Sequence, residues 1–267
     1  MKKFKKLAIA CLAIVTACAA LTACGKSDSA NGGERTKFVV GFDAEYPPYG
    51  FMDDNGEYTG FDLDLAQEVC DRNGWELVKT PVDWDAKDNE LNQGTIDCIW
   101  NGFTINGRED DYTWSEPYVD NSQVIIVKSD SGITDLAGLS GKAVLVQADS
   151  AALAALEGDR KDLKDTFSEL TQVPDYNSAL MTLESGGADA VALDKVVAQY
   201  YVKDKTDTFT ILDEALSTEQ YGIGFKKGNE ELRDAVQKTL KEMVKDGKFE
   251  EIAKKWDQQD VICLTAD

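Results

Sequence analysis

Short apolar and polar blocks alternate along this chain, and from residue 38 onward they predict strands and helices in turn. Short, mostly apolar runs predict strands, and apolar residues three and four positions apart predict helices. The predicted strands cover 38–43, 76–82, 96–100, 124–128, 143–147, 188–193, 209–212 and 221–225. The predicted helices cover 61–73, 86–93, 151–156, 175–185, 232–243 and 249–256. This order predicts an α/β fold with largely parallel sheets.

The N-terminal segment has the layout of an export signal. Lysines open the chain, an apolar run over 7–23 follows, and the run ends in small residues. Leu21-Thr22-Ala23-Cys24 resembles the lipobox of bacterial lipoproteins, in which the peptide is cut before the cysteine and the thiol carries diacylglycerol. The alternative is an uncleaved anchor helix with an incidental cysteine. In either case we expect the rest of the chain outside the cytoplasm, tethered to the cell membrane.

Charge and size limit what the exported part does. A cut after residue 23 removes four of the 28 basic residues and none of the 49 acidic ones, which leaves a net charge near −25. Such a charge argues against nucleic acid as a partner and against a basic patch for anionic lipid. Residues 24–36 are small and polar, so we expect a flexible tether there. The remainder is long enough for one large domain or two lobes.

Cysteine and histidine usage indicates no redox, metal or cofactor chemistry. Cys70, Cys98 and Cys263 remain in the predicted folded part, without a C-x-x-C spacing. These cysteines could form one disulfide or remain as three free thiols, and buried free thiols are the favoured interpretation. The chain has no histidine, which excludes Ser-His-Asp and Cys-His catalysis and every histidine metal site.

Seven short motifs, in order, give the chain a family resemblance. They are 41–49 (GFDAEYPPY), 60–66 (GFDLDLA), Leu91-x-x-Gly94-x-x-Asp97, 101–105 (NGFTI) followed by Arg108, 114–118 (WSEPY), 188–194 (ADAVALD) and 221–228 (YGIGFKKG). Together they resemble the family 3 solute-binding proteins of ABC transporters, which carry polar amino acids. The resemblance covers roughly residues 37–258.

The resemblance implies a periplasmic-binding-protein type II fold, in which two α/β lobes close on a ligand around a hinge. Lobe one is expected at 37–121 plus 225–267 and lobe two at 122–224. The implied function is a lipid-anchored receptor that binds a polar amino acid between the lobes and delivers it to an ABC permease. The resemblance further implies a monomer that is not an enzyme and carries no cofactor.

A zwitterion in a dry cleft needs a cation for its carboxylate and an anion for its ammonium. The resemblance implies that Arg108 binds the carboxylate through two parallel hydrogen bonds, although the Thr104–Arg108 spacing is one residue shorter than is usual in the family. It implies that Asp194, at a strand end, binds the ammonium; open α/β sheets place ligands at that edge. The alternatives are an Arg108 ion pair with Glu109 or Asp110, and a helix N-cap at Asp194.

Four further residues are expected around the ligand. Ser150 offers a helix N-terminus to the carboxylate, although its Asp-Ser-Ala context differs from the family's Gly-Ser/Thr-Thr and a cap-only role is equally open. The resemblance places Tyr46 as an aromatic wall, and Trp84 is the second candidate; both bury apolar ligand surface, with core filling as the alternative. Asp43 meets the ligand side chain or orders water near it.

A polar segment supplies the remaining candidate groups. Asn101, Gly102 and Thr104 offer an amide, a carbonyl and a hydroxyl to the ligand ammonium, and the alternative is a polar turn.

Two other classes of protein compete with the transport interpretation. One is an enzyme on the same fold, similar to cyclohexadienyl dehydratases, in which Asp43 or Glu45 serves as the acid. The other is a ligand-sensing ectodomain, which we expect to continue into a transmembrane helix and a signalling domain.

We predict that Cys24 is acylated and forms the mature N-terminus. Cys24→Ala removes the thiol that carries the lipid, so the variant should be released into the medium or remain as an unprocessed precursor. Metabolic labelling with a fatty acid checks this, and undiminished labelling of the variant would refute it.

Overall fold

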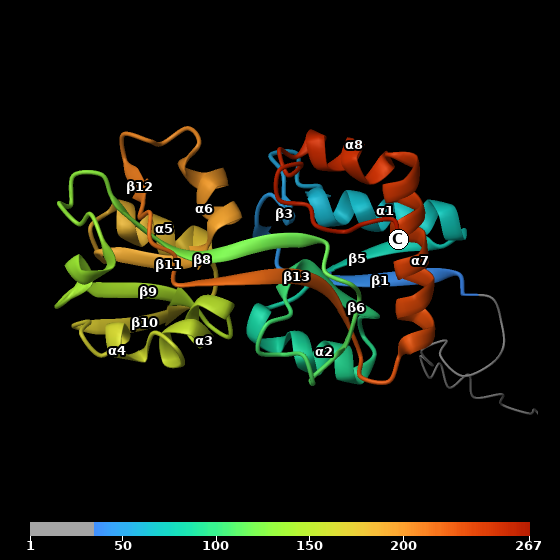
Figure 1. The fold of residues 1–267 in the computed structure, drawn as a ribbon, viewed down its shortest axis with the longest axis horizontal. Helices are drawn as coiled ribbons and strands as arrows, with labels where there is room; N and C mark the ends of the chain where they lie inside the picture. Colours follow the sequence, from blue (N-terminus) through green and yellow to red (C-terminus); the bar gives the residue numbers. More distant parts are fainter. Residues whose placement is uncertain (1–34) are drawn as a thin grey trace, which may run out of the picture. The chain divides into compact units, whose positions relative to one another are not determined.

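The computed structural model describes residues 35–267 (Figure 1). The predicted signal peptide, Cys24 and most of the predicted tether lie outside these residues. Arg35 and Thr36, the last two tether positions, already contact the fold. The Thr36 carbonyl accepts a hydrogen bond from the Glu76 amide at 2.8 Å, and Arg35 Nη1 pairs with Asp97 Oδ2 at 2.8 Å.

One half of the fold contains the two ends of the described chain. Its strands are β1 (Lys37–Phe42), β2 (Glu45–Tyr46), β3 (Gly50–Met52), β4 (Tyr58–Thr59), β5 (Glu76–Pro81), β6 (Cys98–Thr104) and β7 (Thr113–Trp114). Its helices are α1 (Phe61–Asn73), the 3-10 turn η1 (Trp84–Ala86), α2 (Lys87–Gln93), α7 (Glu230–Asp246) and α8 (Lys248–Lys255). In Figure 1 it lies on the right.

The other half comes from the middle of the chain. Its strands are β9 (Ala143–Gln147), β10 (Glu169–Val173), β11 (Ala190–Asp194) and β12 (Phe209–Ile211). Its helices are η2 (Leu136–Leu139), α3 (Ala151–Glu157), α4 (Lys161–Lys164), α5 (Tyr176–Glu184) and α6 (Lys195–Val202).

Two long strands, β8 (Val119–Lys128) and β13 (Ser217–Phe225), connect the halves. The main sheet runs in the order β10-β9-β11-β8-β13-β6-β1-β5, with β12 paired to β8 and β7 to β13. β8 and β13 are antiparallel to each other, and Figure 1 shows them side by side across the middle. They are also antiparallel to their outer neighbours β11 and β6, whereas the remaining pairs on the path are parallel. The prediction of largely parallel pairing is therefore wrong for the central strands.

Most predicted elements are present, and several have the predicted bounds. α1 spans 61–73 and ends at Gly74, whose φ of 71° favours glycine. β9 spans 143–147 as predicted. The 101–104 segment, for which a polar turn was the alternative, instead belongs to β6 and is buried. The sequence prediction missed β10, because its residues ELTQV lack an apolar run.

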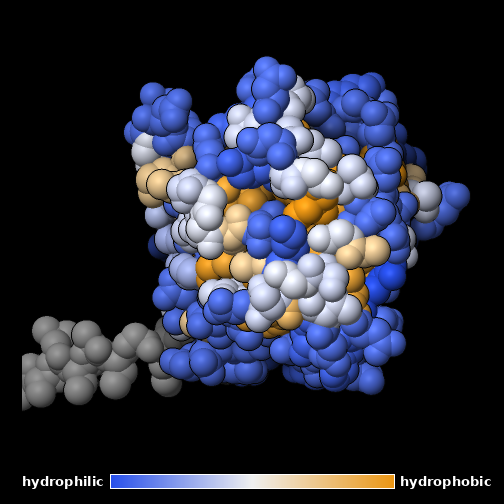
Figure 2. Space-filling view, turned by 90° about the vertical axis from the view of Figure 1, so that its left-hand side faces the viewer, coloured by the Kyte–Doolittle hydropathy of each residue, from blue (hydrophilic) through white to orange (hydrophobic). Residues whose placement is uncertain are grey.

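The core is apolar on both sides of the sheet, and within residues 35–267 no helix is long and apolar enough to cross a membrane. Figure 2 shows the end of the middle-chain half, where hydrophilic residues dominate the rim and hydrophobic ones show near the centre. The thiols of Cys70, Cys98 and Cys263 are free, in agreement with the favoured interpretation.

One buried carboxylate fixes the central segment of β6. Asp62, in the first turn of α1, is fully buried, and its Oδ2 accepts hydrogen bonds from the Gly102 amide at 2.6 Å and the Tyr118 hydroxyl at 2.8 Å. Gly102 has a φ of 56°, and a Cβ there would lie about 3 Å from the rings of Tyr221 and Tyr46. Asp62 therefore holds in place a glycine that cannot be replaced without displacing neighbouring rings.

We expect Asp62→Ala to destabilise the fold by ~2–4 kcal/mol, because two buried donors lose their acceptor. Asp62→Asn keeps an oxygen acceptor, so its free energy of unfolding should fall by less. Denaturant unfolding measures both, with Asp71→Ala on the exposed face of α1 as the matched control, expected within about 0.5 kcal/mol of the parent. An Asp62→Ala variant as stable as the control would contradict the assignment.

Candidate functional site

A cavity of about 840 Å³ lies between the two halves. Its walls come from the ends of β1 and β5, the η1 turn, α2, and the segments that follow β9 and β10. These are the carboxyl ends of parallel strands, where open α/β sheets place their ligands. The volume is within the range of small-molecule sites.

The lining of this cavity is acidic. It contains six carboxylate residues and no lysine or arginine: Asp43, Glu45, Asp83, Asp85, Glu90 and Asp175. Trp84 adds an apolar wall. Two of the predicted site residues, Asp43 and Trp84, thus line the same cavity.

Asp43 bridges the halves. Its Oδ1 accepts from the Glu45 amide at 2.8 Å, and its Oδ2 accepts from Gln147 Nε2, at the end of β9, at 2.7 Å. Burial raises the pKa of Asp43 to about 6, against the effect of these hydrogen bonds. The Asp43 amide donates to Asn101 Oδ1 at 3.0 Å, which links Asp43 to β6.

A second contact between the halves joins Lys87 to Asp149. The Lys87 side chain is 1% exposed, and its ammonium pairs with the Asp149 carboxylate and donates to the Trp84 carbonyl at 3.2 Å. The same ammonium lies 4.9 Å from the centre of the Trp84 ring, within the range of a cation–π interaction. Lys87 is therefore a buried cation that contacts the other half of the fold.

Arg108 reaches the same turn of the other half. Its Nη2 donates to the Asp149 carbonyl at 2.9 Å, its Nη1 lies 3.4 Å from the Thr104 carbonyl, and its guanidinium sits 5.2 Å from the Phe103 ring centre. No ion pair with Glu109 or Asp110 forms in the described part of the chain. The shortened turn thus still points Arg108 across the cleft.

The Asp149–Ser150 turn faces both cations. Asp149 is in the left-handed region with a φ of 54°. Ser150 is the N-cap of α3, and its Oγ accepts from the Leu153 amide at 3.1 Å. The capping role of Ser150 is therefore confirmed, and its ligand role stays a prediction.

Asp194 is part of a buried carboxylate pair. Asp194 and Glu219 are 4% and 6% exposed, at the end of β11 and in β13. Asp194 Oδ1 accepts from the Tyr221 hydroxyl at 2.7 Å, and Oδ2 lies 3.3 Å from the Tyr176 hydroxyl. Asp194 occupies the N-cap position of α6, as the alternative has it, but its side chain makes no capping hydrogen bond. Burial, and then the neighbouring Asp194 charge, raise the pKa of Glu219 to about 8.

Tyrosines connect this pair to the predicted aromatic wall. The Tyr46 and Tyr221 hydroxyls are 3.3 Å apart, and the Tyr46 and Tyr176 rings are 5.9 Å apart between centres. Tyr46 therefore packs in the aromatic core beside the carboxylates, which was the alternative for it, and its role as a wall of the ligand site stays a prediction.

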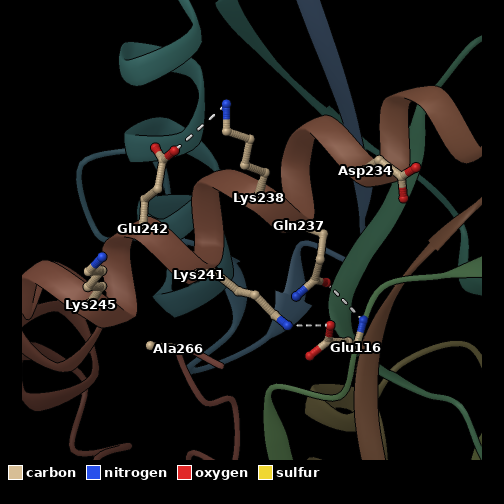
Figure 3. Close-up of a pocket in the computed structure, with 8 residues that line it drawn as sticks. All are labelled: Glu116, Asp234, Gln237, Lys238, Lys241, Glu242, Lys245 and Ala266. Carbon is tan, nitrogen blue, oxygen red and sulfur yellow. Dashed lines mark hydrogen bonds and ion pairs between the residues drawn. The ribbon is translucent and has the colours of Figure 1, made fainter.

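A second concavity, of about 470 Å³, lies along α7 beside Glu116 and Ala266 (Figure 3). Its charges are largely satisfied internally. Lys241 pairs with Glu116 at 2.6 Å and Lys238 lies 3.9 Å from Glu242. The cavity between the halves is the stronger candidate, because six carboxylate residues line it without a lysine or arginine among them.

Comparison with known proteins gives the family to which the chain belongs. The sequence profile of the bacterial extracellular solute-binding proteins, family 3, matches residues 38–259, and the chain belongs to this family. The L-cystine-binding protein TcyJ of Escherichia coli K12 is 32% identical over 231 residues, 85% of each chain. The arginine-binding extracellular protein ArtP of Bacillus subtilis is 32% identical over 252 residues, 92% of this chain and 96% of ArtP.

A solved structure confirms the fold. The substrate-binding protein of an ABC uptake transporter from Streptococcus pneumoniae, with bound histidine, superposes with a TM-score of 0.82. It is 34% identical and covers 85% of this chain and 95% of its own. The predicted two-lobed periplasmic-binding-protein type II fold is therefore correct, and the halves described above are its lobes.

The structure brings the predicted residues into two neighbouring groups. Arg108, Thr104 and Ser150 gather around the Asp149 turn, while Asp194 and Tyr46 gather around Glu219. The sequence analysis missed Lys87, Gln147 and Glu219. Lys87 had a visible signal, since it is the one cation in the stretch DWDAKDNE. Gln147 ends a predicted strand and Glu219 lies two residues before one, and neither had such a signal.

We expect Lys87 and Asp149 to be energetically coupled across the cleft. Lys87→Met and Asp149→Asn remove the same contact, so their losses in unfolding free energy should be non-additive by ~0.5–1.5 kcal/mol. The value is modest because the Asp149 side chain is 50% exposed and screened by water.

Denaturant unfolding of both single variants and the double variant measures the coupling. The Lys37–Glu76 pair, exposed and within one lobe, is the matched control with coupling near zero. Additive losses at Lys87 and Asp149 would show that the contact does not join the lobes in solution.

Proposed function

We propose that this protein is an extracytoplasmic, lipid-anchored receptor that binds a polar amino acid between its lobes and delivers it to an ABC permease. The observation that carries the proposal is the arrangement of charge around the cleft: two cations of one lobe contact the Asp149 turn of the other, and a buried carboxylate pair lies at the end of β11 and in β13. Lys87 and Arg108 reach the Asp149 turn, and Asp194 with Glu219 lies behind the tyrosines. This arrangement of charge suits a zwitterion, whose two ends need opposite partners.

The proposed orientation follows from these charges. The ligand carboxylate takes hydrogen bonds from Arg108 and the N-terminus of α3 at Ser150. The ammonium is directed toward Asp194, with Thr104, Gly102 and Asn101 along its path. The ligand side chain then extends into the cavity past Tyr46 and Trp84 toward Asp43.

The acidic wall favours a ligand with a cationic side chain. The cavity presents six carboxylates without a lysine or arginine among its lining residues. Field lines from charges of one sign, concentrated in a low-dielectric cleft, attract a cation and repel an anion. Arginine or lysine is therefore the proposed ligand class, ahead of glutamate or aspartate. Such binding needs no chemical step, and the protein is proposed to act without catalysis.

A thermal-shift screen of the full-length protein against the twenty amino acids and cystine tests the function. A ligand that binds only the folded state, at about 100 times its dissociation constant, adds roughly 2.7 kcal/mol and raises the melting temperature. We expect the largest shifts with basic amino acids. Incubation with prephenate or arogenate should give no product. The absence of any shift, or turnover of either compound, would contradict the proposal.

Two substitutions test the proposed orientation. Arg108→Ala and Asp194→Asn should each weaken binding of the amino acid found in the screen by at least ~2 kcal/mol, because each leaves a ligand charge without its partner. Asp194→Asn keeps one oxygen acceptor for the surrounding donors. Arg72→Ala, on the outer surface of α1 with partners Glu68 and Asp246, is the control and should leave affinity unchanged. Full affinity in Arg108→Ala would place the carboxylate elsewhere.

A further inference from the structure

The buried pair joins Asp194, at the end of β11, to Glu219 on the connecting strand β13. β8 separates β11 from β13 in the sheet, and two of its side chains, Asn121 and Gln123, reach both carboxylates. Asn121 Nδ2 donates to Asp194 Oδ1 at 2.9 Å and to Glu219 Oε1 at 2.7 Å. Gln123 Nε2 donates to the same two oxygens at 2.6 and 2.7 Å. The two carboxylate oxygens therefore face each other across the same pair of amides.

No cation compensates the pair. Within residues 35–267, neither carboxylate has an ion pair with lysine or arginine. The other titratable groups around it are the phenols of Tyr221 on β13, Tyr176 on α5, Tyr46 on β2 and Tyr49. Burial and the adjacent carboxylates raise the pKa of each phenol well above its usual value, so these groups stay neutral. Two facing negative charges in such a place are costly, and the pair retains a proton more strongly than a free carboxylate does.

Each of the two amides that donate to the pair also has an oxygen acceptor without a partner. Gln123 is fully buried and Asn121 half-buried, yet Gln123 Oε1 and Asn121 Oδ1 have no hydrogen-bond partner in the described part of the chain. Buried acceptors without donors are uncommon in folded proteins. Acceptors without donors, beside two carboxylates without a cation, match a ligand that brings both a positive charge and several N–H donors.

We propose that Asp194 and Glu219 share one proton when the cleft is empty, and that the α-ammonium of the bound amino acid displaces it into solvent. The inference rests on the proposed function and makes Glu219 a second ammonium-binding residue beside Asp194. The balance is simple: the ammonium brings one positive charge to the pair, and one proton leaves it. Binding near neutral pH then releases close to one proton, with any amino acid whose ammonium is protonated.

Proton release on binding means that the affinity for the amino acid should rise with pH. With a pKa for Glu219 of about 8, proton release makes affinity rise up to tenfold per pH unit below 8 and level off above it. The folding stability of the free protein should change with pH in the opposite direction. A folded-state pKa raised above the unfolded value stabilises the fold at low pH, and that stabilisation is lost as the pH rises toward 8.

Isothermal titration calorimetry of the full-length protein tests this at pH 7 in phosphate and in Tris, which differ in protonation enthalpy. The probe is L-arginine, then L-lysine, L-glutamine and L-cystine. The change in observed enthalpy with buffer enthalpy counts the protons released. We expect a value near one for the parent protein. Asp43 contributes little at this pH, because its pKa is only about 6.

Glu219→Gln retains an oxygen that accepts hydrogen bonds from the Asn121 and Gln123 amides. The variant should bind the amino acid with almost no proton release, and its affinity should not change with pH. Glu116→Gln, which changes a surface carboxylate paired with Lys241, should keep the parent count. If Glu219→Gln does not fold, the affinity of the parent protein from pH 6 to 8 gives the same information, and a flat profile overturns the inference. If the parent protein binds an amino acid but releases no proton, the inference is wrong and the proposed function still holds. No heat with any probe overturns both.

Discussion

The antiparallel pairing of β8 with β13 is the constraint on which the rest of this structure depends. These strands connect the lobes, and their register places Gln123 opposite Ser217 and Asn121 opposite Glu219. Because side chains alternate along a strand, Asn121 and Gln123 share one face, and both point at the carboxylates. The connection between the lobes and the ammonium end of the proposed site are therefore built from the same backbone.

Charge is distributed unevenly around the cleft, and the distribution explains why closure and ligand recognition are linked. Lys87 and Arg108 come from one lobe, and the Asp149 turn that they contact comes from the other. Asp43 likewise meets Gln147 across the cleft. Each of these polar contacts requires both lobes, so a change in the angle between lobes alters all of them together. A hinge of this kind responds to a ligand by the difference in its affinity for the open and closed arrangements.

Membership of family 3 of the extracellular solute-binding proteins accounts for the architecture, whereas the chemistry of the cleft belongs to this chain. Relatives of similar identity bear names that refer to cystine and to arginine. Relatives with the same fold are thus named for different amino acids, and a fold alone does not decide which ligand a protein binds. Here the cavity wall is acidic, and the buried pair behind it adds a further negative charge whenever its proton leaves.

The amino-acid sequence by itself determined the local elements and the strand ends at which the candidate site lies. Apolar periodicity and a glycine stop set α1 at 61–73, and an apolar run ending in a polar residue set β11 with Asp194 at its end. These features are local, because they depend on side-chain spacing and on backbone preferences a few residues apart. Only the tertiary structure decided which side chains meet. Lys87 and Asp149 are 62 positions apart, and Asn121 and Glu219 are 98 apart. The partners of a buried charge are set by strand order and register across the whole chain, and no local pattern contains that information.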